Sequence, residues 1–175
     1  YLGTSAWVAA SSRTADKFIN GAAATQSAER DMNLIAGITE SAGANIQWLQ
    51  DQFFAREKEE YGSEIFSYMN EEIKKVPPGS DHLVCTPWML GERCPVASTT
   101  TRSTLFNINM EHTRAHFLRA VYEGIAYNLR WILENYEKDY GFNCDDFRII
   151  DKGSRQMYSI FYVVFPKFNI VCSFF

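Results

Sequence analysis

Three segments of the chain carry residues that could hold a phosphate or a nucleotide, and the first is Gly3-Thr4-Ser5. Glycine lets a backbone approach a phosphate closely, and the hydroxyl groups of Thr4 and Ser5 can donate to its oxygens. The apolar run around them, residues 1–10, predicts a strand, a tight turn and a second strand. Ordinary hairpin turns have the same composition, so phosphate binding and a simple turn both remain open.

The second segment begins a predicted helix from Glu40 to Ala55. Its apolar side chains recur at three- and four-residue spacing and predict one buried stripe, formed by Ala42, Ile46, Leu49 and Phe53. We expect Thr39 to be its N-cap. Gly43 costs a helix about 1 kcal/mol relative to alanine, and the close approach of a flat ligand would offset that cost. Tight packing of the helix is the alternative explanation.

The third segment is a glycine-containing turn that follows a predicted buried strand from Phe147 to Ile150. The turn reads Asp151-Lys152-Gly153-Ser154. In α/β proteins, ligands bind just beyond the carboxyl ends of the strands. A single glycine does not by itself distinguish such a site from an ordinary turn.

The longest predicted helix runs from His112 to Tyr140, with Asn109 as its N-cap and Gly141 at its C-terminal end. Its buried stripe consists of Phe117, Val121, Ile125, Leu129, Ile132 and Tyr136. His112 and His116 lie one turn apart, a spacing that can bind a metal, but no third ligand is indicated. We therefore expect packing or capping at the helix start, and no metal site.

The remaining segments complete a mixed pattern of strands and helices. Residues 63–75 predict a helix capped by its own first residue, and its buried face is Ile65, Tyr68, Met69 and Ile73. Residues 82–86 predict a short strand, residues 88–101 a loop, and residues 11–31 a loop or short strands. The charged residues 56–60 fit a solvated helix end. Strands mixed with long amphipathic helices indicate the α/β class.

The composition fits one globular domain with a cytoplasmic location. The chain has 175 residues, 46% of them hydrophobic, and a net charge of -4, which argues against nucleic acid as the main partner. Its four cysteines form no CxxC pair, so we expect reduced thiols. Residues 158–175 are rich in aromatic side chains, but Pro166 and Lys167 interrupt them, which argues against a membrane span and favours a strand-like tail. If exposed, this tail would promote aggregation.

The order and spacing of these motifs resemble the C-terminal domain of FGGY-family carbohydrate kinases and, within them, the xylulokinases. The strongest match is GERCP at residues 91–95, then Arg102, then HTRAHFLRAVYEGIAYNLR at residues 112–130. ESAGANIQWLQD at residues 40–51 is similar to the xylulokinase and glycerol kinase versions. YLGTSAWV resembles the family's second phosphate loop, and FRII with Gly153-Ser154-Arg155 resembles its adenosine motif. The resemblance covers residues 1–155.

The resemblance implies an actin-like ATPase fold built from ribonuclease H-like domains, with ATP and a sugar between them. This chain would be part of the C-terminal, nucleotide-binding half, with ATP and Mg²⁺ as cofactors. Gly3 and Thr4, with Ser5 in the same turn, would meet the ATP phosphates. Gly43 and Gln47 would border the nucleotide, and Gly153 and Ser154 would face the adenosine. Arg93 and the loop of Arg102 would be structural parts near the cleft.

Several departures from the family pattern limit what the resemblance implies. Asp151 and Lys152 stand where the adenosine motif has glycines, so a carboxylate and a long side chain would crowd the adenine there. Ala97-Ser98 replace a Trp-Asp pair, Arg102-Ser103 stand where the family has Arg-Gly, and Asn107-Ile108 replace a Gly-Leu pair. After Arg155 the similarity stops, so we expect residues 1–155 to form the kinase domain and residues 156–175 to be a divergent hydrophobic tail.

The catalytic base and the sugar-binding domain would lie before Tyr1, so we expect no catalytic residue in this chain and no sugar kinase activity from it alone. The sugar implied by the likeness is D-xylulose. A degenerate, non-catalytic nucleotide-binding or regulatory module of the same fold is the alternative, and an unrelated α/β domain is a third. A homodimer is left open.

Overall fold

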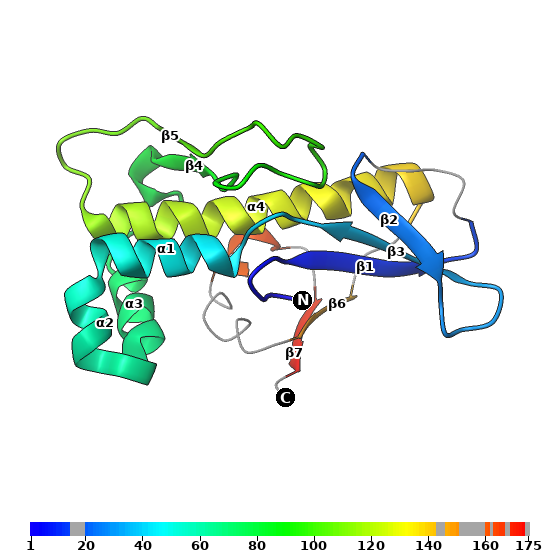
Figure 1. The fold of residues 1–175 in the computed structure, drawn as a ribbon, viewed down its shortest axis with the longest axis horizontal. Coiled ribbons are helices and arrows are strands. Elements are labelled where there is room, and N and C mark those ends of the chain that lie inside the picture. The colour runs from blue at the N-terminus through cyan, green and yellow to red at the C-terminus, as the bar shows by residue number, and fades with distance from the viewer. Residues whose placement is uncertain (15–19, 143–145, 151–159, 162, 167–168, 174–175) are drawn as a thin grey trace.

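A three-stranded antiparallel sheet forms one end of the molecule. The computed structural model describes residues 1–14, 20–142, 146–150, 160–161, 163–166 and 169–173. Strands β1 (Trp7–Ser12), β2 (Ala22–Gln26) and β3 (Asn33–Ile38) pair in the order β1-β3-β2 (Figure 1). The predicted turn at residues 3–5 is present. In place of the strand predicted before it, Leu2 and Ala6 form an isolated antiparallel bridge across the turn.

The long helix α4 (Arg114–Tyr140) runs through the middle of the molecule and supports most other elements (Figure 1). It begins with a capping box in which Thr113 and His116 exchange side chain-to-backbone hydrogen bonds. Asn109 is therefore not the N-cap; its side chain accepts from the Glu111 amide instead. The helix ends as predicted at Gly141, whose φ of 67° is left-handed and suits glycine.

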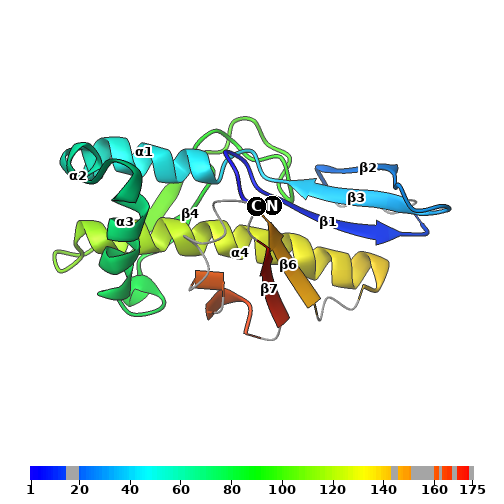
Figure 2. The ribbon, with the colours of Figure 1, turned by 90° about the horizontal axis from the view of Figure 1, so that it is seen from below.

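Three helices follow β3 and form the other end of the molecule. Helix α1 (Gly43–Phe53) runs alongside α4 (Figure 2). Helix α2 (Ala55–Tyr61), the 3₁₀ turn η1 (Gly62–Glu64) and α3 (Ile65–Lys74) form a bend that lies below α1 in Figure 1. The predicted stripe of α1 is buried except at its end, where Phe53 is 38% exposed and Phe54 is fully buried instead. The helix stops at Phe53, so the change of direction turns the next ring inward. Ser63 does not cap α3, whose N-cap is Glu64.

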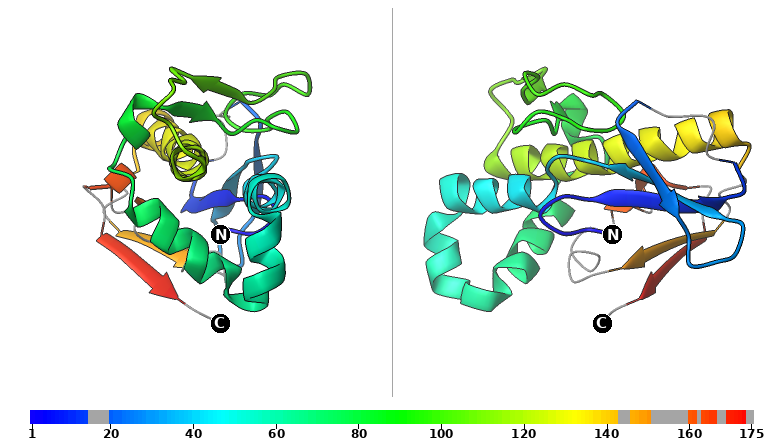
Figure 3. Two further views of the ribbon diagram at one scale, coloured as in Figure 1. Left: turned by 90° about the vertical axis from the view of Figure 1, so that its left-hand side faces the viewer. Right: turned by 45° about the vertical axis from the view of Figure 1, so that its right-hand side comes forward.

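A small hairpin packs against α4. The 3₁₀ turn η2 (Ser80–His82) leads into β4 (Val84–Thr86), which pairs antiparallel with β5 (Thr104–Phe106). The hairpin lies across both α1 and α4 when these helices are seen end-on (Figure 3, left). The contact with α4 is close, because a Cβ added at Gly124 would collide with the carbonyl oxygen of Cys85.

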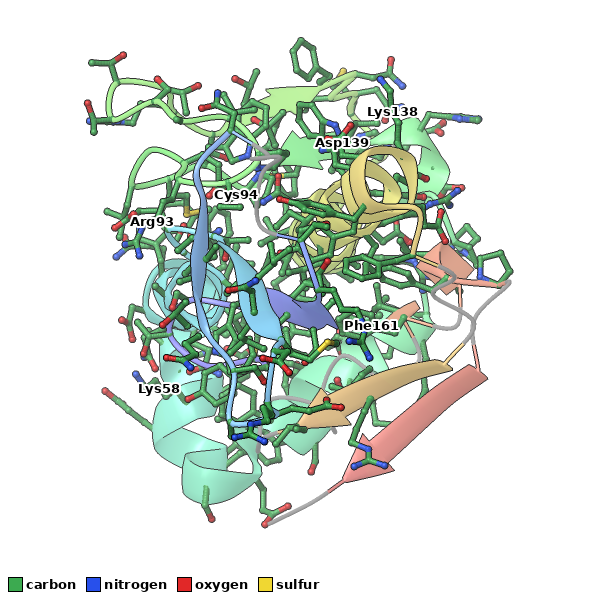
Figure 4. The ribbon with its side chains drawn as sticks, turned by 90° about the vertical axis from the view of Figure 1, so that its right-hand side faces the viewer. Lys58, Arg93, Cys94, Lys138, Asp139 and Phe161 are labelled. Atoms are coloured by element: carbon green, nitrogen blue, oxygen red, sulfur yellow. The ribbon has the colours of Figure 1, made fainter. Side chains whose placement is uncertain are left out.

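The C-terminal segment is part of the fold. Strand β6 (Asp146–Ile150) pairs in parallel with β7 (Asn169–Ser173), which confirms a strand at the end of the predicted tail. Four apolar residues between these strands are at most 1% exposed, namely Ile160, Phe161, Val164 and Phe165. Figure 4 shows Phe161 between α4 and β6. For these four residues the condition for aggregation, an exposed tail, is not met, because they pack into the same core as α4.

The structure describes the side chains of two of the four cysteines and the helices that bear on a membrane span. Cys85 and Cys94 are buried free thiols, as expected; the side chains of Cys144 and Cys172 lie outside what the structure describes. Within the described part of the chain, no helix is both long enough and apolar enough to cross a bilayer.

Candidate functional site

The Gly3–Ser5 turn packs directly against the first turn of α1. The carbonyl oxygen of Thr4 accepts hydrogen bonds from the amides of Ala42 and Ala44, at 2.9 and 3.1 Å, and the carbonyl oxygen of Gly3 accepts from the Gly43 amide at 3.0 Å. These carbonyl oxygens accept hydrogen bonds from amides that would have no partner in an isolated helix. They also explain the helix start, since Thr39 is not the N-cap.

Glycine is required at position 43 by this contact. A Cβ added at Gly43 would lie 2.5 Å from the carbonyl oxygen of Gly3, which is far inside van der Waals contact. The two glycines that the sequence singled out separately are therefore neighbours. The backbone of the turn leaves no room for a side chain at position 43. Tight packing against the helix, the alternative to a bound ligand, therefore accounts for this glycine.

The hydroxyl groups of the turn remain available to a ligand. Thr4 is exposed and Ser5 is half-buried, and neither hydroxyl makes a hydrogen bond within the described residues. The turn itself is closed by a 2.9 Å hydrogen bond from the Gly3 amide to the Ser5 carbonyl. Gln47 lies one helical turn beyond Gly43 on the same side of α1, is exposed, and donates to Asp51 at 3.1 Å.

The carboxyl end of β6 reaches the same turn. The amide of Leu2 donates to the carbonyl of Ile150 at 3.4 Å, which places the end of the strand beside the residue that precedes Gly3. The predicted adenosine residues Gly153 and Ser154 lie outside the described residues. The structure thus brings Gly3, Thr4, Ser5, Gly43 and Gln47 to one region, and the strand that leads to Gly153 ends there.

Thr39 anchors the turn, a role that the sequence did not indicate. Its hydroxyl accepts from the Ala6 amide at 3.0 Å and donates to the Ala6 carbonyl at 3.1 Å, and its own amide donates to the same carbonyl at 2.8 Å. The residue is 1% exposed. Its hydroxyl therefore fixes the start of β1 against the end of β3.

A buried carboxylate holds the other side of the α1 entry. Glu92, in the GERCP segment, is 4% exposed and accepts from the Glu40 amide at 2.9 Å, the Arg93 amide at 2.7 Å and the Cys94 amide at 3.4 Å. Its second oxygen accepts from the Asn128 side chain at 2.8 Å. Burial raises the pKa of the Glu92 carboxyl, and these hydrogen bonds oppose that shift.

The rest of the GERCP segment continues this bracing. Arg93 pairs with Glu40 through hydrogen bonds of 2.8 and 3.0 Å, and Figure 4 shows it at the outer edge of the molecule with Cys94 further in. Burial, with the Glu92 charge nearby, raises the pKa of Cys94 to about 12, so its thiol is not an activated nucleophile. Arg93 therefore braces the start of α1 through Glu40.

The two helix-start histidines serve a structural purpose. His116 completes the capping box of α4 and its Nε2 lies 3.0 Å from Asp81, while His112 Nε2 lies 3.2 Å from the Asp81 carbonyl. No group of three His, Cys, Asp or Glu residues suited to a metal ion occurs among the described residues. The expectation of capping is confirmed.

The mixed α/β architecture and the glycine-containing turn are the features that the resemblance to an actin-like ATPase domain implied. A family model described as the C-terminal domain of the FGGY family of carbohydrate kinases matches residues 1–158. The chain belongs to this family. Its helix α4 and its GERCP loop, which carried the resemblance, lie within that match.

Individual relatives point to sugar kinases of two kinds. The chain is 32% identical to the gluconokinase of Bacillus subtilis over 99 residues, and 30% identical to the xylulose kinase of the same organism over 110 residues. These matches cover 55% and 63% of the chain but 19% and 21% of the relatives. The chain therefore spans about a fifth of the length of these curated relatives.

Solved structures confirm the fold over nearly the whole chain. The structure of xylulose kinase from Rhodospirillum rubrum superposes with a TM-score of 0.84 at 22% identity, covering 98% of this chain and 34% of that one. Gluconate kinase from Lactobacillus acidophilus gives a TM-score of 0.80 at 20% identity, covering 97% and 33%. The predicted actin-like fold is confirmed.

Proposed function

We propose that this chain forms the nucleotide-binding part of a kinase that transfers the γ-phosphoryl group of ATP to a sugar hydroxyl. The observation that supports this most directly is the Gly3–Ser5 turn, held against Gly43 with the hydroxyls of Thr4 and Ser5 available to a ligand. The hydroxyl groups of such a turn can donate to phosphate oxygens. The transfer of a phosphoryl group to a sugar is inferred from the carbohydrate kinase family to which the chain belongs.

The chain's own contribution to the reaction is to bind and orient ATP. Phosphoryl transfer depends on positioning the reactants and stabilising charge. Thr4 and Ser5 would donate to phosphate oxygens, and Gln47 would border the nucleotide. Mg²⁺, when bound, would neutralise phosphate charge.

D-xylulose is the first sugar to test and gluconate the second. Relatives named xylulose kinase and gluconokinase have similar identities to this chain, 30% and 32%. The residues that select the sugar would lie in another domain of a longer protein. We expect the 175-residue chain alone to show no sugar-dependent release of ADP, because half of a cleft cannot position both reactants. Robust release by the purified chain would refute this.

Equilibrium binding of ATP to the purified chain tests the proposal. Thr4→Ala and Gln47→Ala should each weaken ATP binding about tenfold, the loss of one good hydrogen bond to a charged or buried ligand group. Gln52→Ala is the matched control, because Gln52 is exposed on the same helix but on another side. Adenosine should lose little affinity in the Thr4 variant, since it carries no phosphate.

The results test whether the nucleotide site is present. No ATP binding by a folded chain would contradict the proposal and favour a regulatory module that has lost the nucleotide, whose motivation is the Asp151-Lys152 turn. Equal weakening by Gln47→Ala and Gln52→Ala would place ATP elsewhere.

A further inference from the structure

An open cavity lies on a different side of α1 from the Gly3–Ser5 turn. It has a volume of about 640 Å³ and lies between α1, α4 and the segment from residue 85 to residue 105. On α1 it is lined by Ala44, Asn45, Trp48, Leu49 and Phe53. Since each residue rotates the helix by about 100°, this face is centred well away from Gly43 and Gln47.

The wall of this cavity is mainly aromatic and aliphatic. Trp48 and Phe53 meet edge to face at 5.7 Å between ring centroids, and Phe53 stacks on Phe117 at 6.0 Å. Trp48 is 46% exposed although its ring faces the cavity. A volume of this size with aromatic walls is typical of sites for small organic molecules.

A single cation, Arg102, stands among these apolar side chains of the described wall. Its Nη1 donates to the carbonyls of Thr99 and Thr101, at 2.9 and 2.6 Å, and these contacts hold the guanidinium in place. Its other nitrogens make no hydrogen bond or ion pair within the described part of the chain. A guanidinium with free N–H groups recognises carboxylate, sulfonate or phosphate oxygens.

Covalent chemistry at this cavity is disfavoured. The thiol in the wall belongs to Cys85, and burial raises its pKa. The thiol is therefore protonated at neutral pH and a poor nucleophile. The cavity suits reversible binding.

We propose that this cavity binds a small amphipathic anion, a flat aromatic or branched apolar body that packs against Trp48 and Phe117 and carries an acidic group that pairs with Arg102. The site is separate from the proposed nucleotide site. The two ligands therefore bind without displacing each other.

The probe for this site is 1-anilinonaphthalene-8-sulfonate, which joins an aromatic body to one sulfonate. Titration of the chain should show saturable binding of one dye per chain, with quenching of tryptophan emission. Arg102→Gln should weaken it about tenfold, as expected for one charge-assisted hydrogen bond. Arg56→Gln, which removes an exposed arginine on α2, is the matched control and should change nothing.

Two substitutions that fill the cavity from opposite walls provide the second measurement. Leu105→Trp from β5 and Ala44→Phe from α1 should each abolish binding of the dye, and if one loses its native circular dichroism the other decides the question. Excess ATP should leave the dye's affinity unchanged. The proposal is overturned if Arg102→Gln binds like Arg56→Gln, if a natively folded filled variant still binds, or if ATP displaces the dye. ATP affinity, measured separately, tests the proposed function independently.

Discussion

Exchanging the amide and the carboxylate between Glu92 and Asn128 tests whether their hydrogen bonds hold the GERCP loop to α4. Glu92 accepts from three backbone amides through one oxygen and from Asn128 through the other. Asn128 in turn accepts from the indole of Trp88 at 3.2 Å. In Glu92→Gln the new NH₂ group faces the Asn128 NH₂ group. Flipping Asn128 removes that conflict but turns its NH₂ toward the Trp88 donor, so one bond is lost either way.

The cost of Glu92→Gln follows from the burial of both partners. Glu92 and Asn128 are each 4% exposed, and a buried donor left without an acceptor costs about 1–3 kcal/mol. Asn128→Asp alone places a second carboxylate beside Glu92 and should also destabilise the protein. In the double variant every bond can form again. The amide introduced at position 92 donates to the carboxylate introduced at position 128, and the other oxygen of that carboxylate accepts from Trp88.

Urea unfolding of the four proteins measures the coupling between the two positions. We expect the double variant to be more stable than the sum of the single losses predicts, by about 0.5–3 kcal/mol, the range for residues in one hydrogen-bond network. Additive losses would refute the reasoning, because they would show that the two side chains do not share a bond that matters for stability.

Three further outcomes follow from buried contacts. Burial raises the pKa of Glu92. The contribution of this carboxyl group to stability is therefore fully present below its unfolded pKa and is lost as pH rises through the higher folded pKa. Across this acidic range, the melting temperature should fall less with rising pH in Glu92→Gln than in the unchanged protein. Arg119→Met should cost about 3–5 kcal/mol in urea unfolding, because it leaves the buried Glu123, bonded at 2.7 Å, without its cation; a loss below about 1 kcal/mol would be the value of a surface pair and would contradict this. Gly124→Ala should cost about 1–3 kcal/mol by forcing α4 away from Cys85, and an unchanged melting temperature would show that the hairpin gives way freely.

Helices α1, α3 and α4 could be predicted because each repeats its apolar residues over several turns. Strand β3, Asn33–Ile38, was not predicted, since its pairing with β1 and β2 on both edges is not visible in a short apolar run. The three-residue strand β5 was missed for a similar reason, because it exists through its pairing with β4. Local patterns report a helix's own face, whereas short strands depend on distant partners.

The caps and the site show the same limit. Thr39 precedes α1 as an N-cap would, yet its hydroxyl bonds to Ala6, and carbonyls of the Gly3–Ser5 turn satisfy the helix instead. No pattern in the neighbouring sequence indicates that Thr39 bonds to Ala6 while the carbonyls of the turn bond to the helix. The meeting of Gly3 with Gly43 was expected only through the family resemblance, and the bracing carboxylate of Glu92 came from the structure alone.

The Gly3–Ser5 turn has a thermodynamic consequence that goes beyond ligand contact. Through Leu2, Gly3 and Thr4 the chain joins the start of β1, the end of β6 and the first turn of α1, so a ligand seated there contacts a junction of three elements. Folding and occupancy are then linked equilibria. ATP at about a hundred times its dissociation constant would add about 2.7 kcal/mol to the free energy of unfolding. The melting temperature of the whole domain therefore serves as a readout of occupancy at this one turn, without any turnover.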